Sequence, residues 1–349
     1  MKKITLILIH FCFITLAVAQ KHEFKIDGQI LDSAYLNGKV VIQYKDGQLE
    51  NRKDSVTAVK GSFSLTGNIP FVARVTMWIY PSTIGTKKKW PINVFFSLES
   101  CQATIKLKSS MDFELNGSKC YEDQSELNRR SKTILSTVAK ENITKELNRL
   151  SDSFIQAKPV SYYSLLLLEE KAFNTQSHMD LNQDFQNLPK EFKESLIGKK
   201  IAEKIKNLKK VAIGQAAPNF QLRDMSGKFV KLSDYKGKYV FLHFWGSFCK
   251  PCRAENKNLT TAYALLKERN IIFLGISVDE SKSSLVQAIE KDNITWTQLA
   301  SYNGYSEKTV LDYSINGVPS NFLINPKGLI IAKDLKGNEL TQKIIENMK

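Results

Sequence analysis

Cysteine and histidine are scarce in this chain, with five cysteines and four histidines among 349 residues. The cysteines beyond the first 19 residues are Cys101, Cys120, Cys249 and Cys252. A structural zinc site needs about four cysteine or histidine ligands, and the last third of the chain offers only Cys249, Cys252 and His243. We therefore expect no metal site and no bound cofactor.

Long apolar runs are also missing. The apolar segment from Ile4 to Leu16 is shorter than the ~20 residues that a membrane helix needs. Lys2 and Lys3 precede it, and the small-x-small sequence of residues 17–19 follows it. This arrangement predicts a cleaved secretory signal peptide over residues 1–19. We expect a protein exported to the periplasm or cell envelope, without stable membrane insertion after cleavage.

Acidic residues are outnumbered, because Lys and Arg total 50 and Asp and Glu total 35, for a formal charge of +15 at pH 7. Binding to nucleic acid would need basic residues interleaved with exposed aromatics on one face. The densest lysine cluster, in residues 199–210, instead alternates with apolar residues such as Ile201 and Ile205 at helical spacing. We interpret it as the solvated face of an amphipathic helix and expect no nucleic-acid partner.

Glycine is nearly absent between Ser125 and Lys210, where the sequence is rich in Leu, Lys, Glu and Asn and shows a 3.6-residue apolar period. This pattern predicts a helical connector. Residues 22–117 differ, because they consist of short alternating segments separated by turn signals such as Asp46-Gly47 and Gly67-Asn68. They predict a small all-β domain, an antiparallel sandwich or barrel.

From Ile213 onward, segments typical of strands alternate with segments typical of helices and end in an antiparallel pair of strands, 321–324 and 329–333. This order predicts an α/β fold with a mixed central sheet. The expected organisation is a signal peptide (1–19), an N-terminal β domain (20–117), a helical connector (118–210) and an α/β domain (211–349).

One short motif carries the chemistry, Cys249-Lys250-Pro251-Cys252. It follows Tyr239–Trp245, an apolar run typical of a buried strand, and precedes a helical pattern in residues 253–269. Two thiols at this spacing can close into a disulfide and open again, which makes the pair a two-electron switch. The alternative is a static structural disulfide.

The position of the first thiol predicts its role. At the start of a helix, free backbone N–H groups and the helix dipole stabilise an anion, and Lys250 adds a positive charge. We expect Cys249 to be the nucleophile and Cys252, one turn further and less exposed, to be the resolving cysteine. Pro251 costs the helix little at a first-turn position.

The segment from Trp245 to Cys252, together with Gly317-Val318-Pro319, resembles the thioredoxin superfamily. Ala217-Pro-Asn-Phe220 and Phe322–Gly328 resemble its exported TlpA/ResA-like thiol-disulfide oxidoreductases, whose domain is of the AhpC/TSA-redoxin type. This resemblance covers residues 213–349 and implies a thioredoxin-like fold. Residues 22–210 more loosely resemble the β domain and linker that precede such domains in envelope proteins of Bacteroidetes.

The resemblance also implies roles for residues around the motif. Pro319 would follow a cis peptide bond, face the disulfide and leave the backbone of Val318 free to pair with substrate. Glu255 would accept a proton from Cys252, although a surface glutamate is the alternative. The substrate-binding surface would comprise Trp245, Phe248, Lys250, Pro251 and Val318.

His243 occupies the strand position where thioredoxins have a buried aspartate beneath the disulfide. A histidine there could carry protons near neutral pH. A satisfied core side chain is the alternative.

Cys101 and Cys120, the other two cysteines after residue 19, are candidates for a structural disulfide. If residues 103–107 and 112–115 form a hairpin that turns near Ser110-Met111, the two cysteines lie opposite each other. Facing cysteines in an exported protein are expected to form a disulfide. Two free, half-buried thiols are the alternative.

These features together predict an envelope thiol-disulfide oxidoreductase that reduces disulfides of exported proteins. The resemblance implies a membrane electron donor as its reductant and cytochrome c maturation as one task of the family. A thiol oxidase or isomerase is an alternative. A peroxiredoxin-like peroxidase is less favoured, because Gly246 and Leu242 stand where such enzymes have threonine and proline. A binding protein that uses the β domain is the alternative from another class.

Overall fold

The structure, a computed structural model, describes residues 22–82, 90–110, 112–175 and 177–348. It divides into two compact units, the first ending at Asn128 and the second beginning at Arg129. The expected signal peptide lies outside the described residues. No helix within the described ranges is both long and apolar enough to cross a bilayer.

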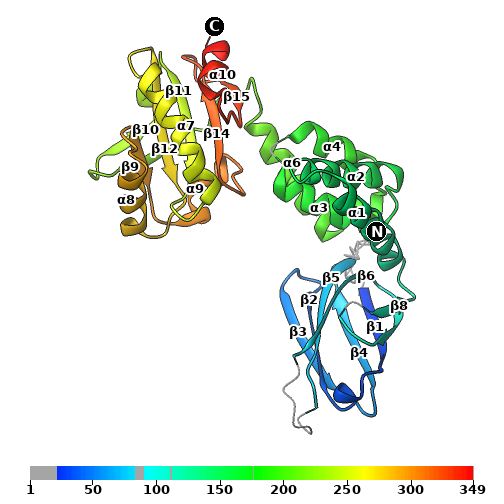
Figure 1. Ribbon diagram of the computed structural model, residues 1–349. Coiled ribbons are helices and arrows are strands. Elements are labelled where there is room, and N and C mark those ends of the chain that lie inside the picture. Colours follow the sequence, from blue (N-terminus) through cyan, green and yellow to red (C-terminus); the bar gives the residue numbers. More distant parts are fainter. Residues whose placement is uncertain (1–21, 83–89, 111, 176, 349) are drawn as a thin grey trace, which may run out of the picture. The chain divides into compact units, whose positions relative to one another are not determined.

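The first unit contains two four-stranded sheets in its described residues, with strand orders β4-β1-β7-β8 and β3-β2-β5-β6 (Figure 1). The strands are β1 (His22–Ile30), β2 (Lys39–Lys45), β3 (Asn51–Thr57), β4 (Ser62–Ile69), β5 (Val72–Ile79), β6 (Ile92–Glu99), β7 (Gln102–Leu107) and β8 (Phe113–Asn116). Within the described residues, neighbouring strands of these two sheets pair antiparallel, except that β1 is parallel to β7. The predicted all-β domain is confirmed.

Alternation along the strands creates the core of this β domain. In β1, Phe24, Ile26 and Ile30 are buried, whereas the intervening Lys25 and Asp27 are exposed and form an ion pair of 2.8 Å. Side chains of both sheets join one apolar cluster. Burying one face of each sheet against the other is what stabilises a sandwich of short strands.

One predicted turn is wrong. Gly67 and Asn68 lie inside β4, where they pair with Phe24 and Glu23 of β1. A Cβ atom on Gly67 would lie 2.4 Å from the hydroxyl oxygen of Tyr44 and 2.5 Å from a ring carbon of Phe24. The glycine therefore allows two aromatic side chains to pack against the strand, and it marks close approach rather than a turn.

A helical segment follows the β domain, as predicted. Its helices are α1 (Lys119–Thr137), α2 (Ile143–Ala157), α3 (Tyr162–Asn174), α4 (His178–Gln186), α5 (Lys190–Glu194) and α6 (Leu196–Lys210). Leucines 165–168 of α3 are all buried, so this helix is enclosed on several sides. Gly198 permits the tight approach of α6 to α5, because a Cβ atom there would lie 2.1 Å from the carbonyl oxygen of Phe192.

The C-terminal domain has a seven-stranded mixed sheet, in the order β10-β9-β13-β12-β11-β14-β15. Its elements are β9 (Gln221–Asp224), β10 (Phe229–Lys231), β11 (Tyr239–Trp245), α7 (Lys250–Leu266), β12 (Ile271–Ser277), α8 (Lys282–Lys291), β13 (Thr297–Ala300), α9 (Lys308–Asp312), β14 (Ser320–Ile324), β15 (Ile330–Lys333) and α10 (Leu340–Asn347). Strands β11, β12 and β13 are parallel, and β14 runs antiparallel to β11. The thioredoxin-like α/β fold is confirmed.

Strand β11 lies in the interior of this sheet and separates two apolar clusters. Phe241 and Trp245 face the cluster formed with α7, α8 and α10, whereas Val240, Leu242 and Phe244 face the cluster that includes α9. Leu259 and Leu266 of α7 are fully buried against the sheet, and each such side chain contributes about 1.5–3 kcal/mol. This packing places the N-terminus of α7 just beyond the end of β11 (Figure 1).

Candidate redox site

A disulfide joins Cys249 and Cys252, whose Cα atoms are 5.2 Å apart. Cys249 is the N-cap of α7, and its Sγ accepts a 3.1 Å hydrogen bond from the backbone N–H of Cys252. Cys249 keeps 8% of its surface exposed, whereas Cys252 is fully buried. The expected redox pair is therefore present in its oxidised form, with Cys249 as the more accessible member.

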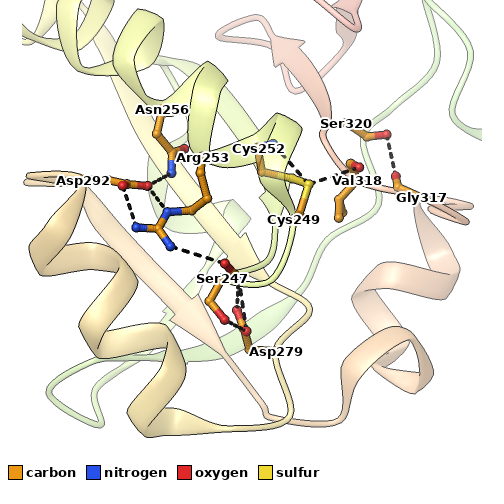
Figure 2. The surroundings of a disulfide bond; sticks show 10 residues. All are labelled: Ser247, Cys249, Cys252, Arg253, Asn256, Asp279, Asp292, Gly317, Val318 and Ser320. Atoms are coloured by element: carbon orange, nitrogen blue, oxygen red, sulfur yellow. Dashed lines mark hydrogen bonds and ion pairs between the residues drawn. A yellow bond between two sulfur atoms is a disulfide. The ribbon is translucent and has the colours of Figure 1, made fainter.

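Val318 approaches this disulfide from a distant part of the sequence (Figure 2). Its peptide bond to Pro319 is cis, as the resemblance implied. The carbonyl oxygen of Val318 lies 3.4 Å from Sγ of Cys249. A disulfide sulfur carries no proton, so this is a contact here, and a reduced Cys249 thiol could donate a hydrogen bond to the same oxygen.

The turn that leads into Cys249 is held from two sides at Ser247. Its backbone N–H donates to the carboxylate of Asp279 at 2.9 Å, and its hydroxyl donates to the same carboxylate. On the other side, the guanidinium of Arg253 donates to the carbonyl oxygen of Ser247 at 3.3 Å. Figure 2 shows Ser247 between these two charged side chains. All the polar groups of Ser247 are thus engaged by side chains outside the turn.

Arg253 is itself fixed by Asp292. The carboxylate of Asp292 accepts from Nε and Nη2 of Arg253, the latter at 2.7 Å, and from the amide of Asn256, also at 2.7 Å. Burial raises the pKa of Asp292, but the donors on Arg253 and Asn256 outweigh it and hold the pKa below its ordinary value. The first two turns of α7 are therefore tied to the end of α8 by an ionised carboxylate.

No sequence motif marked these supporting residues, which are Ser247, Arg253, Asn256, Asp279 and Asp292. One signal could have found Asp279, because it lies two residues after the end of the buried strand β12. Since β11 and β12 are parallel, polar residues after their carboxyl ends meet at one edge of the sheet, beside the CxxC motif. The pairing of Arg253 with Asp292, 39 residues away, left no local signal.

Glu255 is half-buried on α7, three residues after Cys252. Its carboxylate accepts a 2.9 Å hydrogen bond from the backbone N–H of Gly337 and a 3.1 Å hydrogen bond from the amide of Asn258. These contacts link α7 to the segment that precedes α10. Its expected role as a proton acceptor remains a prediction.

His243 is fully buried on β11, opposite Gly275 of β12 and Asn321 of β14. Among the described residues, neither ring nitrogen finds a partner at hydrogen-bond geometry. Burial lowers the pKa of His243 to about 4, and the backbone of Ser320 opposes this shift without outweighing it. The ring is therefore neutral at physiological pH. It is buried like a core side chain, but it lacks the satisfied contacts that we expected of one.

Four of the five residues assigned to the substrate surface are at least partly exposed, and Trp245 is not. Phe248 is 63% exposed, Lys250 and Pro251 are exposed, and Val318 is half-buried beside the disulfide. Trp245, however, is only 1% exposed and donates its indole N–H to the buried Gln298 at 2.9 Å. It lies at the end of β11 on the face that packs against α7, so it supports the two cysteines from within the core. Its assignment to the substrate surface was wrong.

The expected Cys101–Cys120 disulfide is also wrong, because the structure has two free thiols. The predicted hairpin exists as β7 and β8, with Thr104 paired to Asn116. The chain then leaves the strand at Gly117, where φ is +90°, and Cys120 lies in the first turn of α1. Burial raises the pKa of both thiols, to about 12 for Cys101, so neither is ionised near neutral pH.

The described residues contain no group of three or more histidine, cysteine, aspartate or glutamate side chains placed to hold a metal ion.

Two family models match the chain. The AhpC/TSA family covers residues 213–333, and a domain of unknown function, DUF4369, covers residues 24–124. The first match includes the disulfide and Val318, and the second covers most of the β domain. The resemblance expected for the C-terminal domain is thereby confirmed.

Named relatives share the C-terminal domain. The chain is 32% identical over 140 residues to the thiol-disulfide oxidoreductase ResA of Bacillus thuringiensis, a match that covers 40% of this chain and 79% of that protein. It is 34% identical over 122 residues to ResA of Bacillus subtilis, which covers 35% of this chain and 66% of that protein.

Similar solved structures come from Bacteroides. The thioredoxin domain of a thiol-disulfide oxidoreductase from Bacteroides vulgatus is 33% identical, covers 40% of this chain and 99% of that one, and has a TM-score of 0.38. A thiol-disulfide oxidoreductase from Bacteroides fragilis is 34% identical, covers 38% of this chain and 98% of that one, and has a TM-score of 0.36. From its sequence relatives and its CxxC site, this chain belongs to the thioredoxin-like, ResA-related thiol-disulfide oxidoreductases.

Proposed function

We propose that this protein reduces disulfides of exported proteins in the periplasm or cell envelope, using Cys249 and Cys252 as a dithiol. The observation that carries this proposal is the unequal exposure of the two cysteines at the start of α7, where Cys249 reaches the surface and Cys252 is fully buried. A substrate disulfide can approach the first sulfur, and the second is kept for the resolving step.

The reaction follows from this arrangement. In the reduced protein, the Cys249 thiolate attacks one sulfur of a substrate disulfide, forms a mixed disulfide and releases the other substrate sulfur as a thiolate. Cys252 then loses its proton and attacks Sγ of Cys249, which releases the second substrate thiolate. The substrate gains two electrons, and the enzyme is left with the Cys249–Cys252 disulfide seen in this structure.

Surrounding groups support these steps. The backbone N–H of Cys252 points at Sγ of Cys249 and, with the dipole of α7, stabilises its thiolate. We assign substrate contact to Phe248, Lys250 and Pro251, which are exposed beside Cys249, and to the backbone of Val318. Glu255 is our candidate for the proton acceptor of Cys252, because a spacing of three residues places two side chains together on a helix.

The cellular setting in this proposal rests on the sequence. The signal peptide over residues 1–19 supports export, and an oxidising compartment requires a reductant that opens the Cys249–Cys252 disulfide after each turnover. We propose a membrane electron donor for that step. As substrates we propose the proteins that must be reduced during cytochrome c maturation, because the resemblance to the ResA-like family implies this task.

Insulin reduction tests the activity. With dithiothreitol as the electron source, the wild-type protein is expected to accelerate insulin precipitation, and Cys249→Ser is expected to return the rate to that of dithiothreitol alone. Equal rates for the two proteins would contradict the proposal. Equilibration of the disulfide with glutathione buffers tests the direction, because a reduction potential near that of the oxidant DsbA, about −120 mV, would indicate a thiol oxidase.

A further inference from the structure

The turn before Cys249 carries a buried negative charge that the reaction steps do not use. Asp279 is only 3% exposed and lies just beyond the end of β12. Its carboxylate accepts from the N–H and hydroxyl of Ser247 and, at 2.7 Å, from the hydroxyl of Ser277. These neutral donors hold the carboxylate in place but do not cancel its charge.

Ser247 connects this charge to the nucleophile. The residues 246–249 form a tight turn that is closed by a 3.1 Å hydrogen bond from the N–H of Cys249 to the carbonyl oxygen of Gly246. Ser247 is the second residue of that turn, so the carboxylate of Asp279 is bound two residues before Cys249. A negative charge held on the turn that carries the sulfur disfavours the thiolate and so favours the disulfide.

Other charged and titratable groups also lie around the turn. Arg253 on α7 contacts Ser247 from the opposite side and also interacts electrostatically with Asp279, but its hydrogen-bonded ion pair is with Asp292. Lys250 is exposed to solvent, which screens its charge. The phenol of Tyr302 has a raised pKa, mainly through burial and also through the charge of Asp279. Asp279 is thus the buried carboxylate bound directly to this turn.

We propose that Asp279, held against the turn at Ser247, is a positioning residue whose charge disfavours the thiolate of Cys249 and thereby keeps the Cys249/Cys252 pair strongly reducing. The inference rests on the proposed reductase function and deepens it. Thioredoxin-like oxidants are strong oxidants because their reduced form is stabilised, and Asp279 acts in the opposite sense. The N-cap position of Cys249 promotes ionisation, and the buried carboxylate limits it.

Two variants test this with opposite expected signs. Asp279→Asn removes the charge and keeps the shape, so the pKa of Cys249 should fall by about one unit. At pH values below the pKa, a fall of one unit raises the thiolate fraction of Cys249 tenfold. At pH values above the pKa, it makes the reduction potential of the Cys249/Cys252 pair less negative by about 30 mV. Ser247→Ala removes a donor that stabilises the carboxylate and keeps the charge, so the pKa of Cys249 should rise.

The readouts are the pH dependence of Cys249 alkylation and the equilibrium with glutathione, neither of which needs a protein substrate. A failure of the proposed function would appear in insulin reduction instead and leave these readouts intact. Asp312→Asn, which removes a surface carboxylate of α9, is the matched control and should change neither value.

Shifts of the Cys249 pKa with the same sign in Asp279→Asn and Ser247→Ala would indicate mere loosening of the turn and overturn the proposal, as would the absence of any shift. If Asp279→Asn does not fold, the Ser247→Ala variant decides by itself. A Cys249 pKa in that variant at or below the wild-type value would overturn the proposal.

Discussion

Sγ of Cys249 lies 3.4 Å from the carbonyl oxygen of Val318, a residue 69 positions later in the chain. Cys249 belongs to the start of α7, and Val318 belongs to the segment that enters β14 through a cis peptide bond. We therefore expect a substrate cysteine that attacks or is attacked at Cys249 to approach along the backbone of Val318. The site is built from two segments that the sheet brings together.

Replacing Cys252 should trap the mixed disulfide. In Cys252→Ser the resolving thiol is missing, so Cys249 can still attack a substrate disulfide but the product cannot be released. We expect a covalent adduct with an oxidised protein substrate, detected on a non-reducing gel and abolished by dithiothreitol. Cys249→Ser should give no adduct. An adduct that forms equally well without Cys249 would assign the attack to another thiol.

The free cysteines of the β domain should react slowly. Burial, with help from Glu99, raises the pKa of Cys101 to about 12, so its thiolate is rare at pH 7.5. After full reduction, iodoacetamide is expected to modify Cys249 at least ~100-fold faster than Cys101 or Cys120. Mass spectrometry of timed digests measures the three rates. Comparable rates would show that the β domain exposes a reactive thiol.

His243 should make stability pH-dependent. Its pKa in the folded protein is about 4, below the ordinary 6.5 of an unfolded chain. As pH falls below about 6.5, the unfolded state therefore binds a proton that the folded state does not, and stability decreases until about pH 4. The total effect is on the order of 3 kcal/mol.

Denaturant unfolding at several pH values tests this effect of His243. His243→Leu should lose that part of the pH dependence, whereas His178→Asn, which leaves the buried His243 ring in place, should retain it. Parallel curves for the wild type and His243→Leu between pH 6.5 and 4 would show that the buried ring is not the cause.

Removing Asp292 should destabilise the redox domain. Asp292→Ala would leave Arg253 without its carboxylate and the fully buried Asn256 without an acceptor for its amide. We expect a loss of about 2–3 kcal/mol in the free energy of unfolding, measured with urea. Since the pKa of Asp292 lies below its ordinary 3.8, this loss should be complete above about pH 4 and shrink at lower pH.

Asp312→Ala is the matched comparison for Asp292→Ala. It removes an exposed (i, i+4) pair with Lys308 and should cost no more than about 0.5 kcal/mol. Equal losses in the two variants would mean that the contacts of Asp292 are no stronger than those of a surface ion pair.

Local patterns predicted most of the C-terminal domain correctly. The strand of residues 239–245, the CxxC motif and the helix after it appear as expected, because apolar periodicity and the motif are written in adjacent residues. Strand β13 was missed, since Thr297–Ala300 is only four residues long and offers no clear alternation. It is a strand because β12 and β9 supply its hydrogen-bonding partners.

Two predictions that depended on the distance between residues or on burial were wrong. The spacing of Cys101 and Cys120 predicted facing positions, but Gly117 redirects the chain into α1. Trp245 belongs to the motif that resembles the family, yet its place at the end of β11 buries it beneath the disulfide. Neither outcome can be read from residue types, since both depend on where the chain turns after a strand.

The sequence by itself determined the chemistry of this protein, because two cysteines at the start of a helix form a redox pair wherever that short segment folds. The tertiary structure decided how the pair is held and tuned. Val318, Asp279 and Asp292 come from three separate parts of the chain, and only the parallel order of β11 and β12 and the antiparallel β14 bring them to one edge of the sheet. Contacts across such distances leave no local pattern, since they arise from packing of the whole domain.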